Sequence, residues 1–155
     1  SPEAAMIDLD ALGARVRAAI PLTAHLDFQF TDFNGEQLTL TAPLGPNHND
    51  KGTFFAGSQS ALLTLAGWSL TTLLARQAGA TADVVAVETG LKYLLPLDSD
   101  MHITASASAD DIHRFEQRLQ RRGKATLSIL AQGTSANGTQ VCEYQGLYLA
   151  RIGLP

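Results

Sequence analysis

Residues that could bind and orient a substrate gather between positions 47 and 64. A polar loop, Asn47–Thr53, is followed by Gly57 and by the hydroxyl and amide groups of Ser58, Gln59 and Thr64. If a helix begins at Gly57 or Ser58, its first N–H groups lack partners and carry partial positive charge, which suits an oxygen that gains negative charge. Gly57 would let a substrate approach the backbone closely, or would only permit tight packing.

Activation of a water molecule is harder to assign from these residues. The amide of Asn49 can donate and accept but cannot take a proton at neutral pH, and Thr64 could hold a water. The carboxylates to consider are Asp50, which a loop could leave solvated, and Glu88, on the strand that follows the helix. Burial of Glu88 would raise its pKa towards the range of a general base.

Metal and thiol chemistry find no support in the sequence. The four histidines lie in separate segments without ligand spacing, so we predict no metal site and no cofactor. The single cysteine cannot form an intrachain disulfide and is typical of a small core residue. A Gly-x-Ser-x-Gly elbow is absent, which argues against a serine triad. These five residues are His25, His48, His102, His113 and Cys142.

A long uncharged segment, residues 54–75, must position the polar loop. A helix without a charged face is expected to be buried all round, so we expect the helix to run from residue 57 or 58 to about Gln77 inside a curled sheet. Alternation and turn residues such as Asn34-Gly35 and Asn137-Gly138 predict the remaining elements. We expect an amphipathic helix over 8–20, strands over 25–33, 36–42, 84–95, 100–109, 124–132 and 140–152, and a short helix or broad bulge over 110–122.

Composition places the chain among globular proteins. The chain has 155 residues, 45% hydrophobic and 17% charged, which suits one domain over 1–155. The net charge of −4 argues against broad nucleic-acid binding. The N-terminus lacks a basic start followed by an apolar run, so we expect a cytoplasmic protein that does not enter a membrane.

The one basic cluster lies at residues 114–124 and includes Arg121 and Arg122. Arginine suits phosphate groups such as those of coenzyme A. The competing interpretation is the solvated face of a surface helix.

The order of elements, with two strands, a glycine-bearing loop, a buried helix and a strand ending in Tyr93-Leu94-Leu95-Pro96, resembles the α+β hotdog fold over essentially the whole chain. Within that fold the sequence resembles the thioesterase domain of the YiiD C-terminal-like family. The matching motifs are Ala42-Pro43-Leu44, Asn47 to Gly52 with Lys51-Gly52-Thr53, Gly57-Ser58 and Gly67-Trp68.

The resemblance implies an acyl thioester hydrolase acting on acyl-coenzyme A or an acyl carrier protein, assembled as a homodimer or a dimer of dimers with sites between protomers. In phenylacetate-type hotdog thioesterases an Asn, a His-Gly pair and a glycine pair precede a catalytic helix Asp. On this chain they fall on Asn49, on Lys51 and Gly52, on Ala56 and Gly57, and on Thr64.

The resemblance therefore implies a site at the start of the central helix, with Gly57 donating to the oxyanion. The residues with catalytic roles would be Asn49, Gly57, Thr64 and Glu88, the last if it faces the partner's helix. Those with substrate-binding roles would be Asn47, His48, Lys51, Gly52, Phe54, Phe55, Ser58, Gln59, Trp68, Arg121 and Arg122. Trp68 could equally be core packing.

The helix acid of related enzymes is absent, since Thr64 stands at its position. This favours an alternative, a hotdog module that binds an acyl thioester without hydrolysing it. A dehydratase or hydratase on the same fold usually wants a His and a carboxylate facing each other, and the helix has neither. A partner domain for an enzyme located elsewhere has no positive feature in the sequence.

Overall fold

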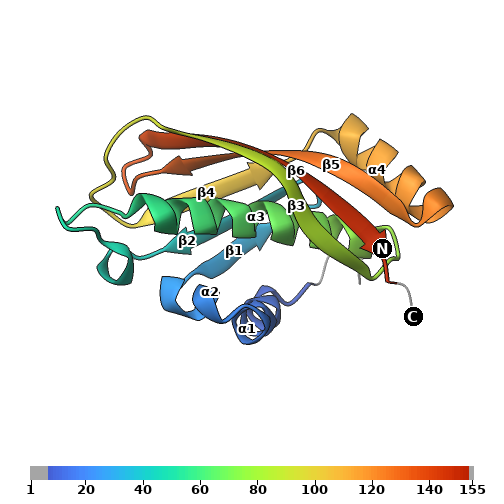
Figure 1. Cartoon of the computed structure of the whole chain (residues 1–155), viewed down its shortest axis with the longest axis horizontal. Coiled ribbons are helices and arrows are strands. Elements are labelled where there is room, and N and C mark those ends of the chain that lie inside the picture. Colours follow the sequence, from blue (N-terminus) through green and yellow to red (C-terminus); the bar gives the residue numbers. More distant parts are fainter. Residues whose placement is uncertain (1–6, 154–155) are drawn as a thin grey trace.

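The long uncharged helix is the axis of the molecule (Figure 1). In the computed structural model, which describes residues 7–153, this helix is α3 and spans Ala56–Gln77. Its leucines pack into the hollow of one curved sheet, and Leu62, Leu70 and Leu74 are fully buried. Gly79 follows the helix with a φ of +83°, a backbone conformation that favours glycine and ends the helix.

One antiparallel sheet wraps around α3, as the sequence predicts. The described residues form six strands in the spatial order β1-β2-β4-β5-β6-β3. Their bounds are Gln29–Phe33 (β1), Gln37–Ala42 (β2), Ala82–Tyr93 (β3), Met101–Ser106 (β4), Lys124–Thr134 (β5) and Gln140–Ile152 (β6). Inward-facing side chains from all of these strands and the leucines of α3 form a single core.

The N-terminal segment differs in part from the prediction. Helix α1 spans Leu9–Ala19, and Asp8 caps it by accepting a hydrogen bond from the Ala11 N–H at 3.0 Å. Pro21 ends α1 but also begins a second short helix, α2, over Pro21–Leu26. The predicted strand start at residue 25 is therefore wrong, because proline is well accommodated in the first turn of a helix. The strand begins only after Asp27, whose φ is +54°.

The ambiguous segment after β4 is a helix, α4, over Ala109–Arg122. The Ser108 hydroxyl caps it by accepting from the Asp111 N–H, and Gly123 ends it with a φ of +75°. Its apolar face, Ile112, Phe115 and Leu119, is buried. The Gln120 side chain donates to the Ala78 carbonyl at 3.0 Å, so α4 ends beside the end of α3 (Figure 1).

Helix α3 is not buried all round within one protomer. A stripe along it, formed by Gly57, Ala61, Thr64, Trp68, Thr72 and Arg76, is only partly covered or exposed. These residues are three or four positions apart and so lie on one face of the helix. The expectation of burial on every side was based on the absence of charged residues in the helix. The open stripe also lacks charged residues before Arg76, since its residues are apolar or carry hydroxyl groups, so the absence of charge did not distinguish it from the buried faces.

Strand β3 forms one edge of the sheet and pairs only with β6 among the described strands. It is long and carries exposed apolar side chains, including Val85 at 54% and Val87 at 55% exposure. Monomeric proteins usually protect such an edge with charges, proline or a covering element. Strand β3 carries Asp83, Glu88, Lys92 and a bulge between Ala86 and Glu88, but no second described strand pairs with it, so the unpaired edge offers both backbone hydrogen-bonding groups and apolar surface to a partner.

Candidate functional site

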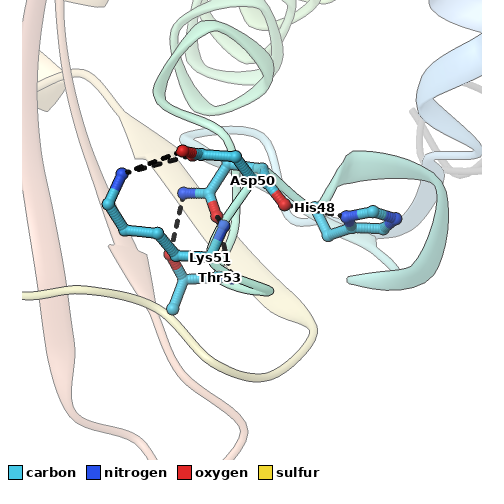
Figure 2. A network of polar contacts seen from close by, with 5 residues as sticks. His48, Asp50, Lys51 and Thr53 are labelled. Carbon is cyan, nitrogen blue, oxygen red and sulfur yellow. Dashed lines mark hydrogen bonds and ion pairs between the residues drawn. The ribbon is translucent and has the colours of Figure 1, made fainter.

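The loop before α3 is folded by the side chain of Asn49 (Figure 2). Its Oδ1 accepts hydrogen bonds from the Lys51 N–H at 2.8 Å and the Thr53 N–H at 3.0 Å, and its Nδ2 donates to Thr53 Oγ1 at 2.8 Å. An asparagine that bonds nearby backbone in this way stabilises a tight turn. Gly52 completes the turn with a φ of +80°. The Asn49 side chain is thus largely committed to the shape of the loop.

Three predicted substrate-binding residues are buried and hold this loop and α3 in place. Asn47 Nδ2 donates to the carbonyls of Leu26 and Pro43, each at 2.9 Å. Gln59 Nε2 donates to the Phe54 carbonyl at 3.1 Å, and Phe54 itself is a core residue. Their burial suits positioning of the site rather than contact with a substrate.

Other predicted residues of the loop are open to solvent. His48 is exposed, and its Nδ1 lies 2.9 Å from the Asn49 carbonyl oxygen (Figure 2). Lys51 pairs with Asp50 at 3.2 Å, and both side chains are more than three-quarters exposed. An exposed pair of this kind contributes little to stability and leaves both groups free to meet a ligand.

The first turn of α3 has three backbone N–H groups without acceptors in residues 7–153, those of Ala56, Gly57 and Ser58. The next N–H, that of Gln59, bonds the Phe55 carbonyl at 3.1 Å. Phe55 occupies the N-cap position, and its side chain cannot cap the helix. The helix start thus presents uncapped donors and the positive end of the helix dipole.

An aromatic ring rests on this helix start. A Cβ built on Gly57 would lie 2.4 Å from Cε2 of Phe55, so the glycine makes room for the ring. The Phe55 side chain is 53% exposed and forms an apolar wall beside the open N–H groups. Ser58, partly buried, lies on the same turn.

Tyr93, at the end of β3, also contacts the start of α3, and sequence analysis predicted no role for its side chain. Its hydroxyl donates to the Ala56 carbonyl at 2.9 Å. The ring is half exposed, and partial burial raises the pKa of the phenol, so it stays protonated. The hydrogen bond fixes the end of an edge strand to the start of α3.

Two turns further along the open stripe lies Thr64, which is partly buried. The hydroxyls of Thr71 and Thr72 bond back to carbonyls one turn earlier in α3, whereas the Thr64 hydroxyl has no such bond within residues 7–153. The Thr64 carbonyl instead accepts from the Tyr148 hydroxyl at 3.1 Å. The Thr64 hydroxyl is therefore available to a water or a substrate.

Tyr148 locks α3 to the sheet at this level. Its hydroxyl is also bonded to that of Tyr144, and burial raises the pKa of Tyr148 so that it remains neutral. Two glycines make space for the pair. A Cβ on Gly67 would approach the Tyr148 hydroxyl to 2.3 Å, and one on Gly146 would approach the Tyr148 ring to 2.7 Å.

Trp68 follows Thr64 along the stripe. Its Nε1 donates to the Val84 carbonyl at 2.9 Å, which ties α3 to β3. The ring remains partly exposed. Trp68 thus packs in the fold and also offers an apolar surface on the open face of α3.

Two groups of predicted residues do not join the site within one protomer. Glu88 pairs with Leu147, whereas the neighbouring Ala86 pairs with Tyr148, whose side chain points at α3. Glu88 is exposed and lies on the outer face of the sheet rather than towards this α3. Arg121 and Arg122 are exposed at the end of α4, at the opposite end of α3 from Gly57 (Figure 1).

Thiol and metal chemistry gain no support from the geometry. Burial raises the pKa of the Cys142 thiol to about 11, so it stays protonated at neutral pH. No three His, Cys, Asp or Glu side chains within residues 7–153 lie close enough together to hold a metal ion. No helix in that same part of the chain has the length and apolar character needed to cross a membrane.

Comparison with known proteins places these features in a family. Residues 9–152 match the model of the family described as "Putative thioesterase (yiiD_Cterm)". A solved structure from Shewanella oneidensis, titled a "putative thioesterase", is 26% identical with a TM-score of 0.80, over 94% of this chain and 97% of that one.

Two further structures are similar in fold. A Pseudomonas aeruginosa protein titled "Probable Thioesterase" is 23% identical with a TM-score of 0.76, over 96% of this chain and 99% of that chain. A Haemophilus influenzae thioesterase is 14% identical with a TM-score of 0.77, over 97% and 94% of the two chains. The sheet wrapped around one long helix is thus the hotdog architecture of thioesterases.

Proposed function

Because the chain belongs to the family described as "Putative thioesterase (yiiD_Cterm)", we propose that it hydrolyses an acyl thioester of coenzyme A or of an acyl carrier protein. The observation that carries this proposal is the uncapped start of α3. The Gly57 N–H has no acceptor within residues 7–153 and no side chain of its own to obstruct a substrate.

In the proposed reaction the thioester carbonyl oxygen accepts a hydrogen bond from Gly57. A water oxygen forms a bond to the carbonyl carbon, the C–S bond breaks, and the products are a carboxylic acid and a thiol. The oxygen carries negative charge in the tetrahedral intermediate, so the N–H groups bind it more strongly there than in the substrate. One such donor is typically worth about 3 kcal/mol in the transition state.

Water is positioned in this proposal by Thr64, whose hydroxyl is uncommitted among the described residues, with Asn49 shaping the adjacent loop. The general base would be Asp50, which lies on that loop, or Glu88. Glu88 could act only on a substrate that reaches the outer face of the sheet, because it does not face the α3 of its own protomer and β3–β3 pairing would keep it on that face. The carbonyl and the water then each have a named group, and the base returns the proton that it takes from the water to the leaving sulfur.

The acyl chain would lie against Phe55 and Trp68, which line the open face of α3 at its start and middle. A second protomer would close this face, because the stripe is apolar or hydroxylic as far as Thr72 and lies beside the unpaired β3 edge. Exposed Leu94 and Leu95 continue the apolar surface beyond Tyr93. We therefore propose a two-fold homodimer through β3, with each site at the interface.

The test is thiol release from a panel of acyl-coenzyme A thioesters, short to long and aromatic, by the wild-type protein and four variants. The variants are Asn49→Ala, Thr64→Ala, Asp50→Asn and Glu88→Gln. We expect chain-length-dependent turnover by the wild type and a lower kcat for Thr64→Ala. Full activity in Asp50→Asn would remove Asp50 as the base, and the same holds for Glu88→Gln.

A second candidate, a module that binds acyl thioesters without hydrolysis, is favoured by one observation. Helix α3 contains no Asp, Glu or His, and Asp50 is exposed to solvent rather than held in a buried site. The same panel separates the two functions. No turnover on any thioester, with binding still detectable by calorimetry, would establish the binding module.

A further inference from the structure

The position of α4 relative to β3 indicates a role for the arginine cluster in a dimer that it could not have in a single protomer. Strand β3 begins at Ala82, which pairs with Ile152 of β6, and the Ile152 N–H donates to the carbonyl of Gly123 at the end of α4. The other end of β3 is bonded to the start of α3 through Tyr93. Thus β3 runs from the end of the molecule where α4 lies to the end where α3 begins at Ala56 and Gly57.

The cluster itself consists of Arg114, Arg118, Arg121 and Arg122, which with Gln117 line a surface hollow of about 260 Å³. Arg114 is paired with Asp111 at 2.6 Å. The other three arginines form no ion pair within residues 7–153. Their spacing puts them on one exposed face of α4, so three guanidinium groups are available to an anion with several charges.

Within one protomer the cluster is too far from Gly57 to share a coenzyme A molecule with it. Helix α3 has 22 residues and is about 33 Å long, and α4 ends beside its far end. The pantetheine arm of coenzyme A has about thirteen bonds between its sulfur and the nearest phosphorus of the pyrophosphate. Since three backbone bonds span about 3.5 Å when extended, this arm reaches about 15 Å.

Across a β3–β3 interface the distance is shorter. With the two-fold axis at the centre of β3, between Val87 and Glu88, antiparallel pairing of two copies of β3 would set Tyr93 of one copy opposite the partner's Ala82. From there the partner's Ile152 and then the partner's Gly123, whose carbonyl accepts from the Ile152 N–H, follow at successive strand positions. These steps each measure about 4.8 Å, so the partner's α4 ends roughly 15 Å from Tyr93. The separation is of the same order as the reach of the arm, and the Tyr93 hydroxyl is bonded to Ala56, the neighbour of Gly57.

We propose that the arginine cluster of α4 binds the 3′-phosphate and pyrophosphate of a coenzyme A thioester whose acyl carbonyl lies at Gly57 of the other protomer. This inference rests on the proposed function and selects coenzyme A over a carrier protein as the thiol carrier. Each site is then incomplete without the second copy, since one copy supplies the oxyanion donors and the other supplies the phosphate contacts.

The first experiment compares the triple variant Arg118→Glu, Arg121→Glu, Arg122→Glu with the wild type on acyl-coenzyme A and on acyl-pantetheine, which lacks these phosphates. We expect the KM for acyl-coenzyme A to rise about tenfold or more, with the kcat and the KM for acyl-pantetheine nearly unchanged. Arg15→Glu on α1 makes the same change in net charge as Arg121→Glu alone. Comparison of these two single variants therefore controls for net charge.

The second experiment uses mixed dimers purified through two different tags. The triple arginine variant is paired with Gly57→Val, which places a side chain against Phe55 at the oxyanion position. Each homodimer should turn over acyl-coenzyme A poorly at subsaturating concentration. The mixed dimer has one complete site if phosphates bind across the interface, so we expect about half of the wild-type rate. A mixed dimer no more active than the two homodimers would overturn the cross-protomer arrangement.

Failure of the proposed function can be told apart from failure of this inference. If the wild type hydrolyses acyl-pantetheine with the same KM as acyl-coenzyme A, the thioesterase stands and the phosphate site is overturned. A much lower KM for an acyl carrier protein would likewise overturn the choice of coenzyme A. If no thioester is hydrolysed, calorimetry with coenzyme A still decides, because equal affinity for wild type and triple variant would refute the site.

Discussion

At the scale of single residues, Gly57 is the position on which the proposed chemistry depends. Its side-chain hydrogen is the only substituent that fits beneath the Phe55 ring, since a Cβ would lie 2.4 Å from that ring. A larger residue must displace Phe55, which is half exposed and can move, so the fold should survive while the helix start is disturbed.

We therefore expect Gly57→Ala to lower kcat by about tenfold, because its methyl group and the displaced ring would crowd the N–H donors. Thiol release measures the effect, and thermal unfolding should change little. Gly45→Ala is the matched control, since Gly45 has no neighbour within 4 Å of an added Cβ and no positive φ. Equal losses in both variants would show that Gly57 has no special role.

The Tyr144–Tyr148 pair gives a second prediction at this scale. Tyr148→Phe removes the bond to the Thr64 carbonyl and leaves the Tyr144 hydroxyl buried without its partner. We expect a loss of about 1–3 kcal/mol in the free energy of unfolding, measured with urea. The double variant with Tyr144→Phe should lose less than the sum of the single variants, because no orphaned hydroxyl remains. Additive losses would contradict the coupling.

At the scale of elements, the loop before α3 is a preformed support for the site. Asn49 organises it with three side-chain hydrogen bonds, while Asn47 ties it to α2 and to the end of β2. The family motif in this loop therefore acts chiefly through backbone shape, which decides where the first turn of α3 faces.

This view makes Asn49 a positioning residue, and two substitutions separate that role from direct catalysis. Asn49→Asp keeps the Oδ1 that accepts from both the Lys51 and Thr53 N–H groups, whereas Asn49→Ala removes it. We expect hydrogen exchange at these two amides to accelerate about tenfold or more in Asn49→Ala and little in Asn49→Asp. Thiol release should fall in the variant whose Lys51 and Thr53 amides exchange faster, and should be kept where these amides stay protected. Loss of activity in Asn49→Asp with protected amides would instead indicate direct contact with substrate.

At the scale of the whole molecule, the unpaired β3 edge and the open stripe of α3 lie side by side. Both expose apolar side chains, and the hydrogen bond from Trp68 to Val84 joins them. A two-fold axis along this edge would cover both surfaces at once, since an antiparallel strand is complementary to itself. In such a dimer the same interface would both join the protomers and complete the catalytic sites.

A lysine at the centre of the edge should separate the protomers. We expect Val87→Lys to shift the protein from dimer to monomer in light scattering and to reduce thiol release about tenfold or more, because a charge would be buried at the interface. Leu22→Lys is the control, since Leu22 is exposed to 61% on α2, away from β3. A monomeric Val87→Lys protein with full activity would show that each site is complete in one protomer.

The sequence by itself determined the elements and their order. Alternation of apolar side chains, the turn residues and the uncharged run of 54–75 are local patterns, and they predicted the strands and a central helix inside a curled sheet. The resemblance of this order of elements to a known fold added the hotdog class. They failed at His25 and Leu26, where the proline that ends α1 also begins α2. They also could not decide whether residues 110–122 were a helix or a bulge.

Only the tertiary structure decided which polar residues face a substrate. Asn47, Gln59 and Asn49 look alike in the sequence, yet their amides are committed to backbone groups that the fold brings near. Strand register placed Glu88 on the outer face, and the bond from Tyr93 to Ala56 joins positions 37 residues apart. Sequence periodicity determines the local secondary structure of a residue, whereas long-range packing determines which groups its side chain contacts. A functional site depends on those contacts, so the tertiary structure was needed to define it.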